Sequence, residues 1–428
     1  MEKIRVGIFG LNRGAAHIPG FLGNNADIVA VCDQRENLLE SARKKLGDGV
    51  GYYTSFDEFI EHDMDAVLLA NYFHEHTPFA IRCLEKNIHV LAECTASSTM
   101  AECVALVRAA EKSKAKFMLC ENYPFRRACV EIKRVCDTGT LGQFRYAEGE
   151  YNHPTAGSDI AFVKRYRYFD RHWRHFLPKT YYSTHALAPM MHCTGATPVR
   201  VTVLPICCEN NKRTENPYLL SRSSDLGAVI TTLNDDGSVF RICAGFGAHS
   251  VAYRICGSKG QVEEVRGSDG KIMLRYNPWD KPEGVEEATQ FYRAEWNDAD
   301  KDLIEKSGHG GGDFLVVREF LNCIRNDTQP CFDAYFSATM SAVAILGHRS
   351  MLQKGVPYDI PDFHSEEERA KWENDTITPF WGADGTPPSI QCGSDPDFGP
   401  TEEQYRLYRR DIEGITDDAD EYSKPVQA

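Results

Sequence analysis

Short apolar runs alternate with stretches of helical pattern through the first 120 residues of the chain. Five of these runs have the length and composition of buried strands: residues 6–9, 28–32, 66–70, 89–92 and 117–120. Strands that alternate with helices form βαβ units, and successive units build a parallel sheet with helices on both faces. The pattern therefore predicts an α/β protein whose first domain, residues 1–122, is a doubly wound parallel sheet.

A different pattern follows residue 122. Asp235-Asp236-Gly237 separates apolar runs at 226–233 and 239–246, and a glycine turn at 257–260 separates two further runs. Both arrangements are signals of β-hairpins. With a helical pattern over residues 313–351, they predict an α+β domain at residues 123–357 whose open, mainly antiparallel sheet serves substrate binding and oligomerisation.

Residues 358–428 are polar and acidic, and they predict a C-terminal extension with a mobile end from Asp417 to Ala428.

The charge balance indicates the kind of partner. The chain of 428 residues has 48 Lys and Arg against 62 Asp and Glu, a formal charge of −14, which disfavours nucleic acid and anionic membranes. A small-molecule substrate fits better. We found neither a signal peptide nor an apolar run near the ~20 residues of a membrane span. The 15 cysteines are scattered, often inside apolar runs, so we expect buried thiols and a cytoplasmic protein.

A glycine turn directly follows the first predicted strand. It reads Gly10-Leu11-Asn12-Arg13-Gly14, where Gly10 permits a tight turn and Gly14 a close backbone approach at a helix N-terminus. The turn departs from G-x-G-x-x-G, and taken alone it is also explained as a structural turn. Asp33 ends the second strand, 33 − 14 = 19 residues after Gly14, where a carboxylate binds the adenosine ribose. Together they predict a Rossmann-type site for NAD, with NADP left open by Arg35.

The fourth predicted strand ends in Glu93-Cys94-Thr95. Thr99 and Glu102 then form a capping box that begins a helix. Cys94 therefore lies in a loop at the carboxyl end of a strand, the edge where open α/β sheets bind ligands. A thiol with an ordinary pKa of ~8.5 could take a proton, but a small buried cysteine is the commoner case. We expect Cys94 to line the nicotinamide pocket without acting in the chemistry.

The order of these features resembles the glucose-fructose oxidoreductase / inositol dehydrogenase (Gfo/Idh/MocA) family. Asn71 and His76 after the third strand, KNIHVLAE at 86–93 and LCENYPFR at 119–126 carry the resemblance. Members of that family usually have Glu-Lys-Pro where this chain has Glu93-Cys94-Thr95, and the lysine helps to move the hydroxyl proton during hydride transfer. The residues assigned to NAD are Gly10, Leu11, Asn12, Arg13, Gly14, Asp33, Asn71, His76, Glu93, Cys94, Asn122, Trp173 and Arg174.

Within that family the chain resembles the NAD-dependent glycosidases of glycoside hydrolase family 109, which also lack the lysine. EGEYNHP at 148–154, HWRHFLPKTYYSTHALAP at 172–189 and HGGGDF at 309–314 carry this resemblance. It implies that Tyr151, His153, Tyr182 and His185 line the substrate pocket. Ser183 stands where those relatives have proline. The family also suggests a homo-oligomer, a dimer or a tetramer.

The spacing of these four residues fits shared chemistry. Tyr151 and His153 lie two apart in a strand-like segment, and Tyr182 and His185 lie three apart at a helix start, so each pair shares a face. Imidazole titrates near neutral pH and a phenol can donate a proton to a leaving oxygen, so the set could do the acid and base work. The alternative is ordinary packing with satisfied hydrogen bonds.

Two further motifs each leave two interpretations open, and a set of histidines is considered as a metal site. Trp173-Arg174 braces cofactor or substrate, or belongs to a basic solvated or oligomer-contacting face. The glycines at 309–313 mark a close backbone approach before a helix, or a structural loop. His172, His175, His185 and His192 are spaced too loosely to nominate a metal site, so we expect no metal.

The leading hypothesis is a two-domain, NAD-dependent oxidoreductase that takes hydride from a ring hydroxyl carbon of a sugar or glycoside. By resemblance, the transient ketone would acidify the neighbouring C–H, the aglycone would leave, water would add and the hydride would return. One alternative is a net sugar or polyol dehydrogenase that releases NADH. Another is a non-catalytic sugar or nucleotide sensor.

Overall fold

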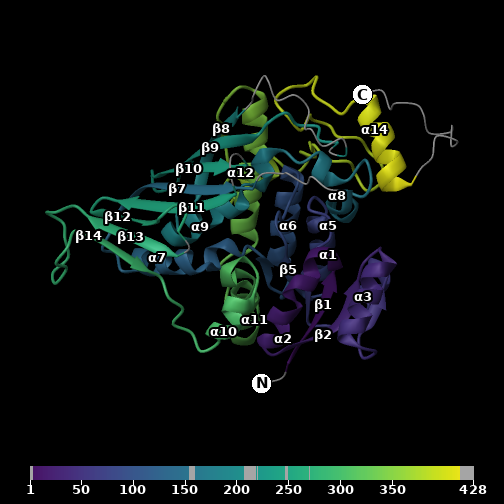
Figure 1. Cartoon of the computed structure of the whole chain (residues 1–428), viewed down its shortest axis with the longest axis horizontal. Helices are drawn as coiled ribbons and strands as arrows, with labels where there is room; N and C mark the ends of the chain where they lie inside the picture. The colour runs from purple at the N-terminus through teal and green to yellow at the C-terminus, as the bar shows by residue number, and fades with distance from the viewer. Residues whose placement is uncertain are drawn as a thin grey trace.

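The computed structural model describes residues 3–153, 160–206, 218, 220–245, 249–268 and 270–414. These residues form two sheets of different kinds, with helices α6, α11 and α12 between them (Figure 1). Residue 246, at the end of the run that follows the first predicted hairpin turn, and the predicted tail from Asp417 to Ala428 lie outside the described residues.

The first sheet has six parallel strands in the order β3-β2-β1-β4-β5-β6. All five predicted strands are confirmed, with ends within two residues of the expectation. The sixth, β3, was missed because it has only three half-buried residues and no apolar run. The strands are β1 Ile4–Phe9, β2 Ala26–Cys32, β3 Gly51–Tyr53, β4 Ala66–Leu69, β5 His89–Ala92 and β6 Phe117–Leu119.

The helices of this domain begin where the sequence signals place them. Thr99 caps α6, and both hydrogen bonds of the capping box with Glu102 are present. The segment after β1 is divided into two short α-helices joined by a 3-10 turn. The helices are α1 Leu11–Gly14, α2 Ile18–Gly23, α3 Glu36–Leu46, α4 Phe56–Phe59, α5 His76–Glu85 and α6 Met100–Lys112.

The second sheet has nine strands in the order β14-β13-β12-β11-β7-β10-β9-β8-β15. Both predicted hairpins are confirmed, as the antiparallel pairs β9–β10 and β11–β12. Among the strand pairs that the described residues form in this sheet, only β7–β10 is parallel. The strands are β7 Phe144–Asn152, β8 Pro198–Ile206, β9 Gly227–Asn234, β10 Val239–Ala244, β11 Ser250–Gly257, β12 Gly260–Glu264, β13 Lys271–Tyr276, β14 Thr289–Arg293 and β15 Tyr358–Asp359.

Helices cover one face of the second sheet. Helix α9 (Thr184–Thr194) lies against β7, β10 and β11, α12 (Ala334–Leu352) against β8, and α7 (Arg127–Asp137) against β12. The second domain also contains α8 Ile160–Tyr166, α10 Lys301–Lys306 and α11 Gly312–Asn326, and α13 Glu366–Ala370 and α14 Glu402–Tyr408 follow it. The fold is therefore the predicted one, a Rossmann-type sheet followed by an α+β unit.

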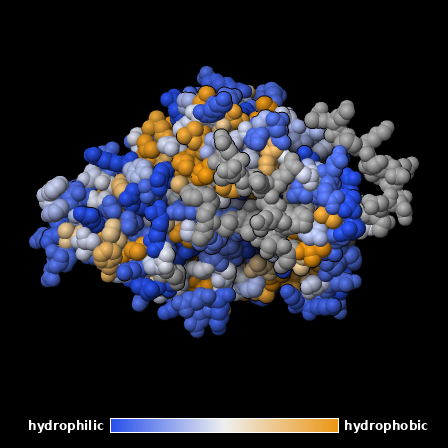
Figure 2. All heavy atoms as spheres, turned by 45° about the horizontal axis from the view of Figure 1, so that its top comes forward, coloured by the Kyte–Doolittle hydropathy of each residue, from blue (hydrophilic) through white to orange (hydrophobic). Residues whose placement is uncertain are grey.

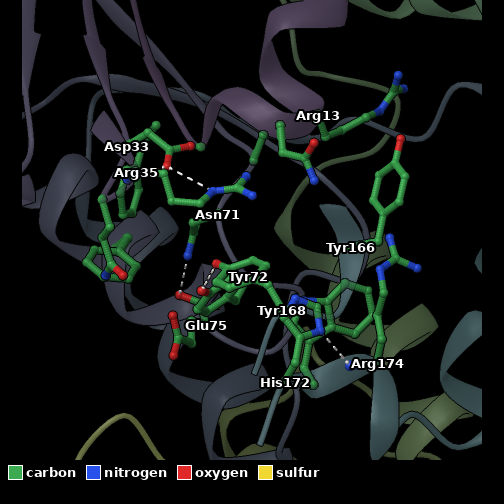
Figure 3. A pocket seen from close by; sticks show the side chains of 17 residues that line it. Arg13, Asp33, Arg35, Asn71, Tyr72, Glu75, Tyr166, Tyr168, His172 and Arg174 are labelled. Atoms are coloured by element: carbon green, nitrogen blue, oxygen red, sulfur yellow. Dashed lines mark hydrogen bonds and ion pairs between the residues drawn. The ribbon is translucent and has the colours of Figure 1, made fainter. Parts of the chain in front are cut away.

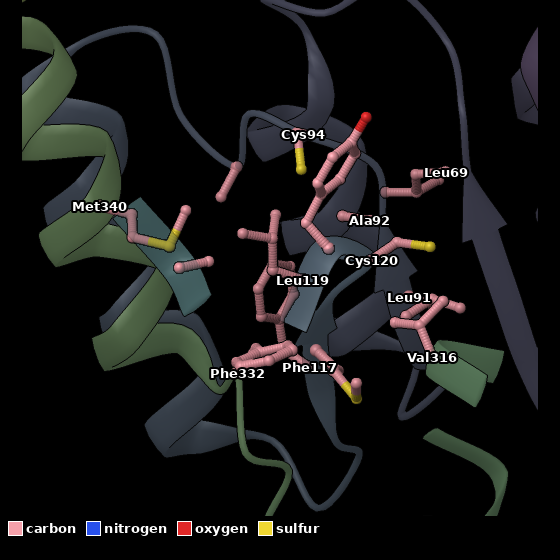
Figure 4. Packing of buried hydrophobic residues seen from close by; sticks show 14 of the residues in the cluster. Leu69, Leu91, Ala92, Cys94, Phe117, Leu119, Cys120, Val316, Phe332 and Met340 are labelled. Atoms are coloured by element: carbon pink, nitrogen blue, oxygen red, sulfur yellow. The ribbon is translucent and has the colours of Figure 1, made fainter. Parts of the chain in front are cut away.

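The two sheets share one hydrophobic core at their junction. Leu91 and Leu119 from the parallel sheet lie in the same cluster as Val316 of α11 and Met340 of α12 (Figure 4). The Leu119 N–H donates to the carbonyl oxygen of Phe332 at 2.9 Å. Because α12 packs against both α6 and β8, the first domain and the second sheet are held in one relative position.

Residues 358–414 pack back onto the body of the protein (Figure 1). Phe380 is buried and its ring lies 5.4 Å from that of Tyr181. Tyr408 of α14 is fully buried and its hydroxyl donates to the carbonyl oxygen of Arg167. The domain limits proposed from the sequence stay a prediction.

The surface is mostly hydrophilic on the face in Figure 2, with hydrophobic side chains gathered toward its upper centre. Exposed apolar side chains on the strands of the second sheet include Leu204, Leu233 and Phe291. Within the described ranges, no helix has both the length and the hydropathy of a membrane span.

Gly149 tests the packing of β7 against α9. A Cβ at this position would lie 2.1 Å from the carbonyl oxygen of Ala186 and 2.9 Å from Met190 Cε. We expect Gly149→Ala to lower the free energy of unfolding by about 1–3 kcal/mol, because the helix backbone must move to admit the methyl group. Gly49→Ala is the control, since a Cβ there meets nothing within 4 Å. Urea unfolding of both variants measures the difference, and equal stabilities would contradict this account.

Candidate functional site

A cleft opens at the carboxyl ends of β1, β2 and β4, where α/β sheets bind nucleotides (Figure 3). Seven of the residues assigned to NAD line it: Gly10, Asn12, Arg13, Asp33, Asn71, Trp173 and Arg174. Its other lining residues are Phe9, Gln34, Arg35, Ala70, Tyr72, Glu75, Phe79, Tyr166, Tyr168 and His172. The second domain thus supplies one wall of the cleft.

The two glycines of the first turn are required for different structural reasons. Gly10 has a φ of +95°, and a Cβ there would lie 2.2 Å from the carbonyl oxygen of Ala70. Only glycine fits that turn without strain. A Cβ at Gly14 would lie 2.6 Å from Cγ2 of Ile8, so Gly14 allows α1 to pack closely on β1. Close packing of helix on strand is one of the roles of glycine in dinucleotide-binding turns.

The Asp33 carboxylate is held by the backbone at the bottom of the cleft. Oδ2 accepts a hydrogen bond from the Leu11 N–H at 2.8 Å, and Oδ1 accepts one from the Arg35 N–H at 2.9 Å. Arg35 Nε lies 3.7 Å from Oδ1, and its guanidinium lies over the ring of Tyr168. Leu11 therefore acts through its backbone, and the carboxylate is oriented before any ligand arrives.

Aromatic side chains form the wall opposite the parallel sheet. The hydroxyl groups of Tyr72 and Tyr168 are hydrogen-bonded to each other, and burial raises the pKa of Tyr72 well above its usual value. The Trp173 ring stacks on Phe73 at 4.9 Å, and the Arg174 guanidinium lies 4.3 Å from the centre of the Trp173 ring. Trp173 and Arg174 both line the cleft, as the bracing interpretation requires, and their role toward cofactor or substrate stays a prediction.

The four predicted substrate residues converge in one cluster. The ring of Tyr151, near the end of β7, lies 5.7 Å from His153, 5.6 Å from Tyr182 and 4.8 Å from His185. The Tyr182 and His185 rings are 5.8 Å apart. Ser183 is the N-cap residue of α9 but makes no capping hydrogen bond with its side chain.

Sequence analysis did not identify Tyr123 and His249, whose rings complete this cluster. Tyr123 stacks on His185 at 4.3 Å, and His249 lies 5.3 Å from His153. Tyr123 belongs to the quoted LCENYPFR motif, so its position after a strand end was a usable signal. His249 lies in a loop of the second sheet, and no sequence signal marked it.

The surroundings of Tyr151, Tyr123 and His153 keep these three rings of the cluster uncharged at neutral pH. Desolvation, followed by the neighbouring Tyr182 and Tyr123 hydroxyl groups, raises the pKa of Tyr151 far above its usual value. Desolvation also raises the pKa of Tyr123 to about 12. The pKa of His153 is lowered, first by desolvation and then by His249. Tyr151 is therefore a neutral phenol that can donate a proton, and His153 a neutral imidazole that can accept one.

Cys94 lies beside this cluster, in contact with a carboxylate that sequence analysis did not assign. Its thiol donates to Oε2 of Glu121 at 3.0 Å, and Oε1 of Glu121 lies 2.6 Å from Nδ1 of His185. Desolvation, then the charges of Glu121 and Glu93, raise the pKa of Cys94 well above its usual value. The thiol is therefore protonated at neutral pH, in line with the expected buried, unreactive cysteine. The Cys94–Thr95 peptide bond is cis.

Glu93 belongs to a separate ionic network that joins the two domains. Its Oε1 lies 2.8 Å from Arg13 Nε and 2.7 Å from His17 Nε2. The same guanidinium pairs with Asp313 of α11 at 2.8 Å, and Asn122 Nδ2 donates to Asp313 at 2.7 Å. Arg13 lines the cleft, whereas Glu93 and Asn122 support it from behind.

Two other predicted positions have protein partners. His76 is buried, and its Nδ1 lies 2.6 Å from the carbonyl oxygen of Thr95. The glycine motif at 309–314 makes the close backbone approach before a helix, because a Cβ at Gly312, where α11 begins, would lie 2.3 Å from the Asn122 carbonyl oxygen, and Asp313 pairs with Arg13. Asn71 lines the cleft, and its buried Oδ1 has no hydrogen-bond partner among the described residues.

These features define a two-domain protein with a dinucleotide cleft in a parallel sheet and a pocket of phenols and imidazoles beside it. Comparison with known proteins agrees. Residues 4–120 match the family model described as an oxidoreductase family with an NAD-binding Rossmann fold, and residues 245–374 match the C-terminal domain of glycosyl hydrolase 109.

Two relatives are similar over most of the chain. A glycosyl hydrolase family 109 protein of Saccharopolyspora erythraea is 27% identical over 424 residues, which cover 91% of this chain and 87% of the relative. An alpha-N-acetylgalactosaminidase of Shewanella oneidensis is 22% identical over 418 residues, which cover 87% of each chain. The chain belongs to the Gfo/Idh/MocA oxidoreductase family, and within it has affinity to glycosyl hydrolase family 109.

Solved structures share the fold. A levoglucosan dehydrogenase, in complex with NADH and L-sorbose, has a TM-score of 0.70 at 15% identity and covers 85% of this chain and 100% of its own. The WlbA dehydrogenase of Bordetella pertussis, in complex with NADH and UDP-GlcNAcA, has a TM-score of 0.63 at 18% identity and covers 84% of this chain and 98% of its own. The predicted cofactor class, NAD, and the predicted family are confirmed.

The network around Arg13 predicts a pH-dependent stability. Although burial alone would raise it, the pKa of Glu93 falls from 4.5 to about 2, because the charge of Arg13 and the hydrogen bond with His17 favour the carboxylate. A lowered pKa stabilises the fold above pH 4.5, and this stability is lost as the pH falls toward 2. The contribution is on the order of 3 kcal/mol.

We expect Glu93→Gln to lower the free energy of unfolding at neutral pH. The difference in this free energy between the variant and the natural protein, the stability gap, should narrow as the pH falls below 4.5. Denaturant unfolding at a series of pH values measures that gap. Glu61→Gln is the control, because Glu61 pairs with Lys86 at an exposed surface and such pairs contribute little. A gap independent of pH would show that Glu93 acts only through packing.

Proposed function

We propose that this chain is an NAD-dependent enzyme that cleaves a glycoside by transient oxidation of a ring hydroxyl carbon followed by elimination. The observation that carries the proposal is the convergence of Tyr151, His153, Tyr182 and His185 beside the dinucleotide cleft. Bound NAD would supply the acceptor that takes the hydride and returns it after the aglycone has left and water has added. The proton transfers that accompany these steps would fall to these four side chains and Glu121.

The first domain would hold the adenosine end of the dinucleotide. Asp33 presents its fixed carboxylate to the ribose hydroxyl groups, which favours NAD over a 2′-phosphorylated ribose. Gly10 and the backbone of the first turn approach the diphosphate, with Arg13 on the rim of the cleft. Trp173 and Arg174 close the opposite side. Cys94 lies deeper, where a small thiol leaves room for the nicotinamide ring.

The four rings would divide the proton transfers. His185, oriented through Nδ1 by Glu121, takes the proton of the hydroxyl that becomes a ketone, with Tyr182 as the alternative. His153, neutral at pH 7, removes the proton from the acidified carbon. Tyr151, which holds its proton at neutral pH and lies within the ring cluster, donates to the leaving oxygen.

A carbohydrate substrate is supported by the relatives. One is named an alpha-N-acetylgalactosaminidase, and structural neighbours were solved with L-sorbose and with UDP-GlcNAcA. An open sheet face with exposed Leu204 and Leu233 supports a homo-oligomer, and a reducing cytoplasmic setting is supported by the described cysteines, which are all free thiols.

A net sugar dehydrogenase is the second candidate. The levoglucosan dehydrogenases among the structural neighbours were solved with NADH, so the same fold binds the reduced cofactor. The two candidates differ in what accumulates. A glycosidase releases aglycone with a catalytic amount of NAD, whereas a dehydrogenase produces NADH in proportion to the oxidised sugar.

Tyr151→Phe tests the chemistry. With a panel of aryl α- and β-glycosides that includes an N-acetylgalactosaminide, we expect NAD-dependent aglycone release without net NADH. The variant should lose about 10²–10⁴-fold in kcat, because it removes the acid.

Tyr146→Phe is the matched control, since Tyr146 lies on β7 with its hydroxyl on Glu148, at the opposite face of the sheet. Stoichiometric NADH would favour the dehydrogenase, and equal rates for Tyr151→Phe and the natural protein would contradict the role of Tyr151.

Asp33→Ala tests the cofactor assignment. Loss of the carboxylate removes its hydrogen bonds to the ribose, so we expect NAD to bind about tenfold more weakly or worse. The affinity for NADP should rise relative to that for NAD, because Arg35 then faces the ribose without a neighbouring negative charge. Titration of both dinucleotides by calorimetry measures the ratio. An unchanged ratio would place the adenosine ribose elsewhere.

A further inference from the structure

Glu121 is a buried carboxylate without a cationic partner of permanent charge. It follows β6, is fully buried, and contacts the Cys94 thiol, Nδ1 of His185 and, at 3.4 Å, the Tyr123 N–H. No lysine or arginine side chain pairs with it among the described residues. A buried charge costs stability unless a second charge or a bound metal compensates it.

A second trio in the same domain shows how the chain treats such a group elsewhere. His17, Glu93 and Cys120 also bring a histidine nitrogen, a carboxylate oxygen and a thiol sulfur within 4.8 Å of one another. There the guanidinium of Arg13 lies 2.8 Å from the carboxylate and supplies the positive charge. The first trio has no such cation, although both are buried beside the cleft.

The donor atoms of Cys94, Glu121 and His185 all lie within 4.8 Å of one another. We propose that these three residues bind a divalent cation of the zinc class. Zinc takes sulfur at ~2.3 Å, imidazole nitrogen at ~2.0–2.1 Å and carboxylate oxygen at ~2.0–2.2 Å, so tetrahedral donors are separated by about 3.3–3.7 Å. The contacts at 2.6 and 3.0 Å need to open by less than about one ångström.

Charge and protonation are consistent with this site. A thiolate and a carboxylate carry two negative charges, so with a neutral imidazole and a divalent cation the buried group has no net charge. Binding releases the thiol proton to solvent, and the imidazole proton moves from Nδ1, where it is donated to Glu121, to Nε2, so that Nδ1 becomes the ligand. This proposal departs from the expectation of no metal, which considered only histidines spaced along the sequence.

Three protein ligands leave a coordination position open, as in catalytic rather than structural zinc sites. His185 lies between Glu121 and the rings of Tyr151 and Tyr182. If the proposed function holds, on which this step rests, a sugar hydroxyl in that position would lose its proton more readily. The cation would then do the work of the absent lysine ammonium, by lowering the hydroxyl pKa.

The experiment measures metal binding without substrate or NAD. The purified full chain is treated with a chelator, dialysed and titrated with cobalt(II), whose thiolate complexes absorb in the near ultraviolet. We expect about one cobalt per chain with this absorption, displaced by zinc. Cys94→Ser should abolish the absorption. Cys94→Ser and His185→Gln, each made alone, should weaken cobalt binding about tenfold to a hundredfold. Cys120→Ser is the matched control and should bind cobalt as the natural chain does.

The outcomes separate this proposal from the proposed function. No stoichiometric cobalt binding by the natural chain, or loss of binding in Cys120→Ser but not in Cys94→Ser, would overturn the site. Thermal melting and NAD titration show whether each variant is folded, and competition with a chelator of known affinity measures binding in the natural chain alone. Cobalt bound at Cys94 in a chain that turns over no glycoside would support the site and contradict only the function.

Discussion

The burial of two carboxylates at the carboxyl ends of β5 and β6 is the constraint on which the site depends. Parallel strands bring Glu93 and Glu121 to one edge of the sheet, where Glu121 is fully buried and the Glu93 side chain is 14% exposed. Each buried charge must be met by a partner. Glu93 is met by Arg13 and His17 from the first domain, whereas Glu121 is met by His185 from the second.

This requirement joins segments that are far apart in the chain. Arg13 pairs at once with Glu93 and with Asp313, which lies 300 residues later on α11. Because α11 and α12 also contribute to the shared core, the ionic network and the apolar packing fix the same relative position of the two sheets. The cofactor cleft is therefore bounded on one side by the first domain and on the other by Trp173, within a rigid frame rather than between two loosely connected domains.

Much of this architecture follows from local sequence patterns. The five buried strands, both hairpins, the capping box at Thr99 and the carboxylate at Asp33 are all short-range signals, and the structure confirms them. Strand β3 was missed because three half-buried residues leave no pattern. Tyr151 and Tyr182 were chosen through a family resemblance, and the ring geometry brings them together.

The missed parts are those that depend on tertiary contact. Glu121 stood in a quoted motif directly after a strand, but only the approach of α9 shows that its carboxylate contacts His185. Likewise, nothing local to Arg13 indicates a pairing with Asp313. The glycines at 310–312 raised two interpretations, and the choice between them required the position of Asn122, whose carbonyl oxygen leaves no room for a Cβ at Gly312.

The cysteine in place of the family's lysine acquires a physical meaning from these contacts. Cys94 Sγ lies 3.0 Å from Glu121, so a basic side chain at this position would neutralise that carboxylate directly. A thiol does not neutralise the Glu121 carboxylate, so His185 or a bound cation must compensate its charge. Because the lysine amine is absent, the site lacks both a proton carrier and a counter-ion, and other groups must take over both roles. The His185–Glu121 pair replaces the first, since a carboxylate orients and strengthens an imidazole base. A divalent cation bound to the same residues would take over both roles instead, because it would neutralise the carboxylate and acidify a bound hydroxyl, so the two proposals concern the same few atoms and yet can fail separately.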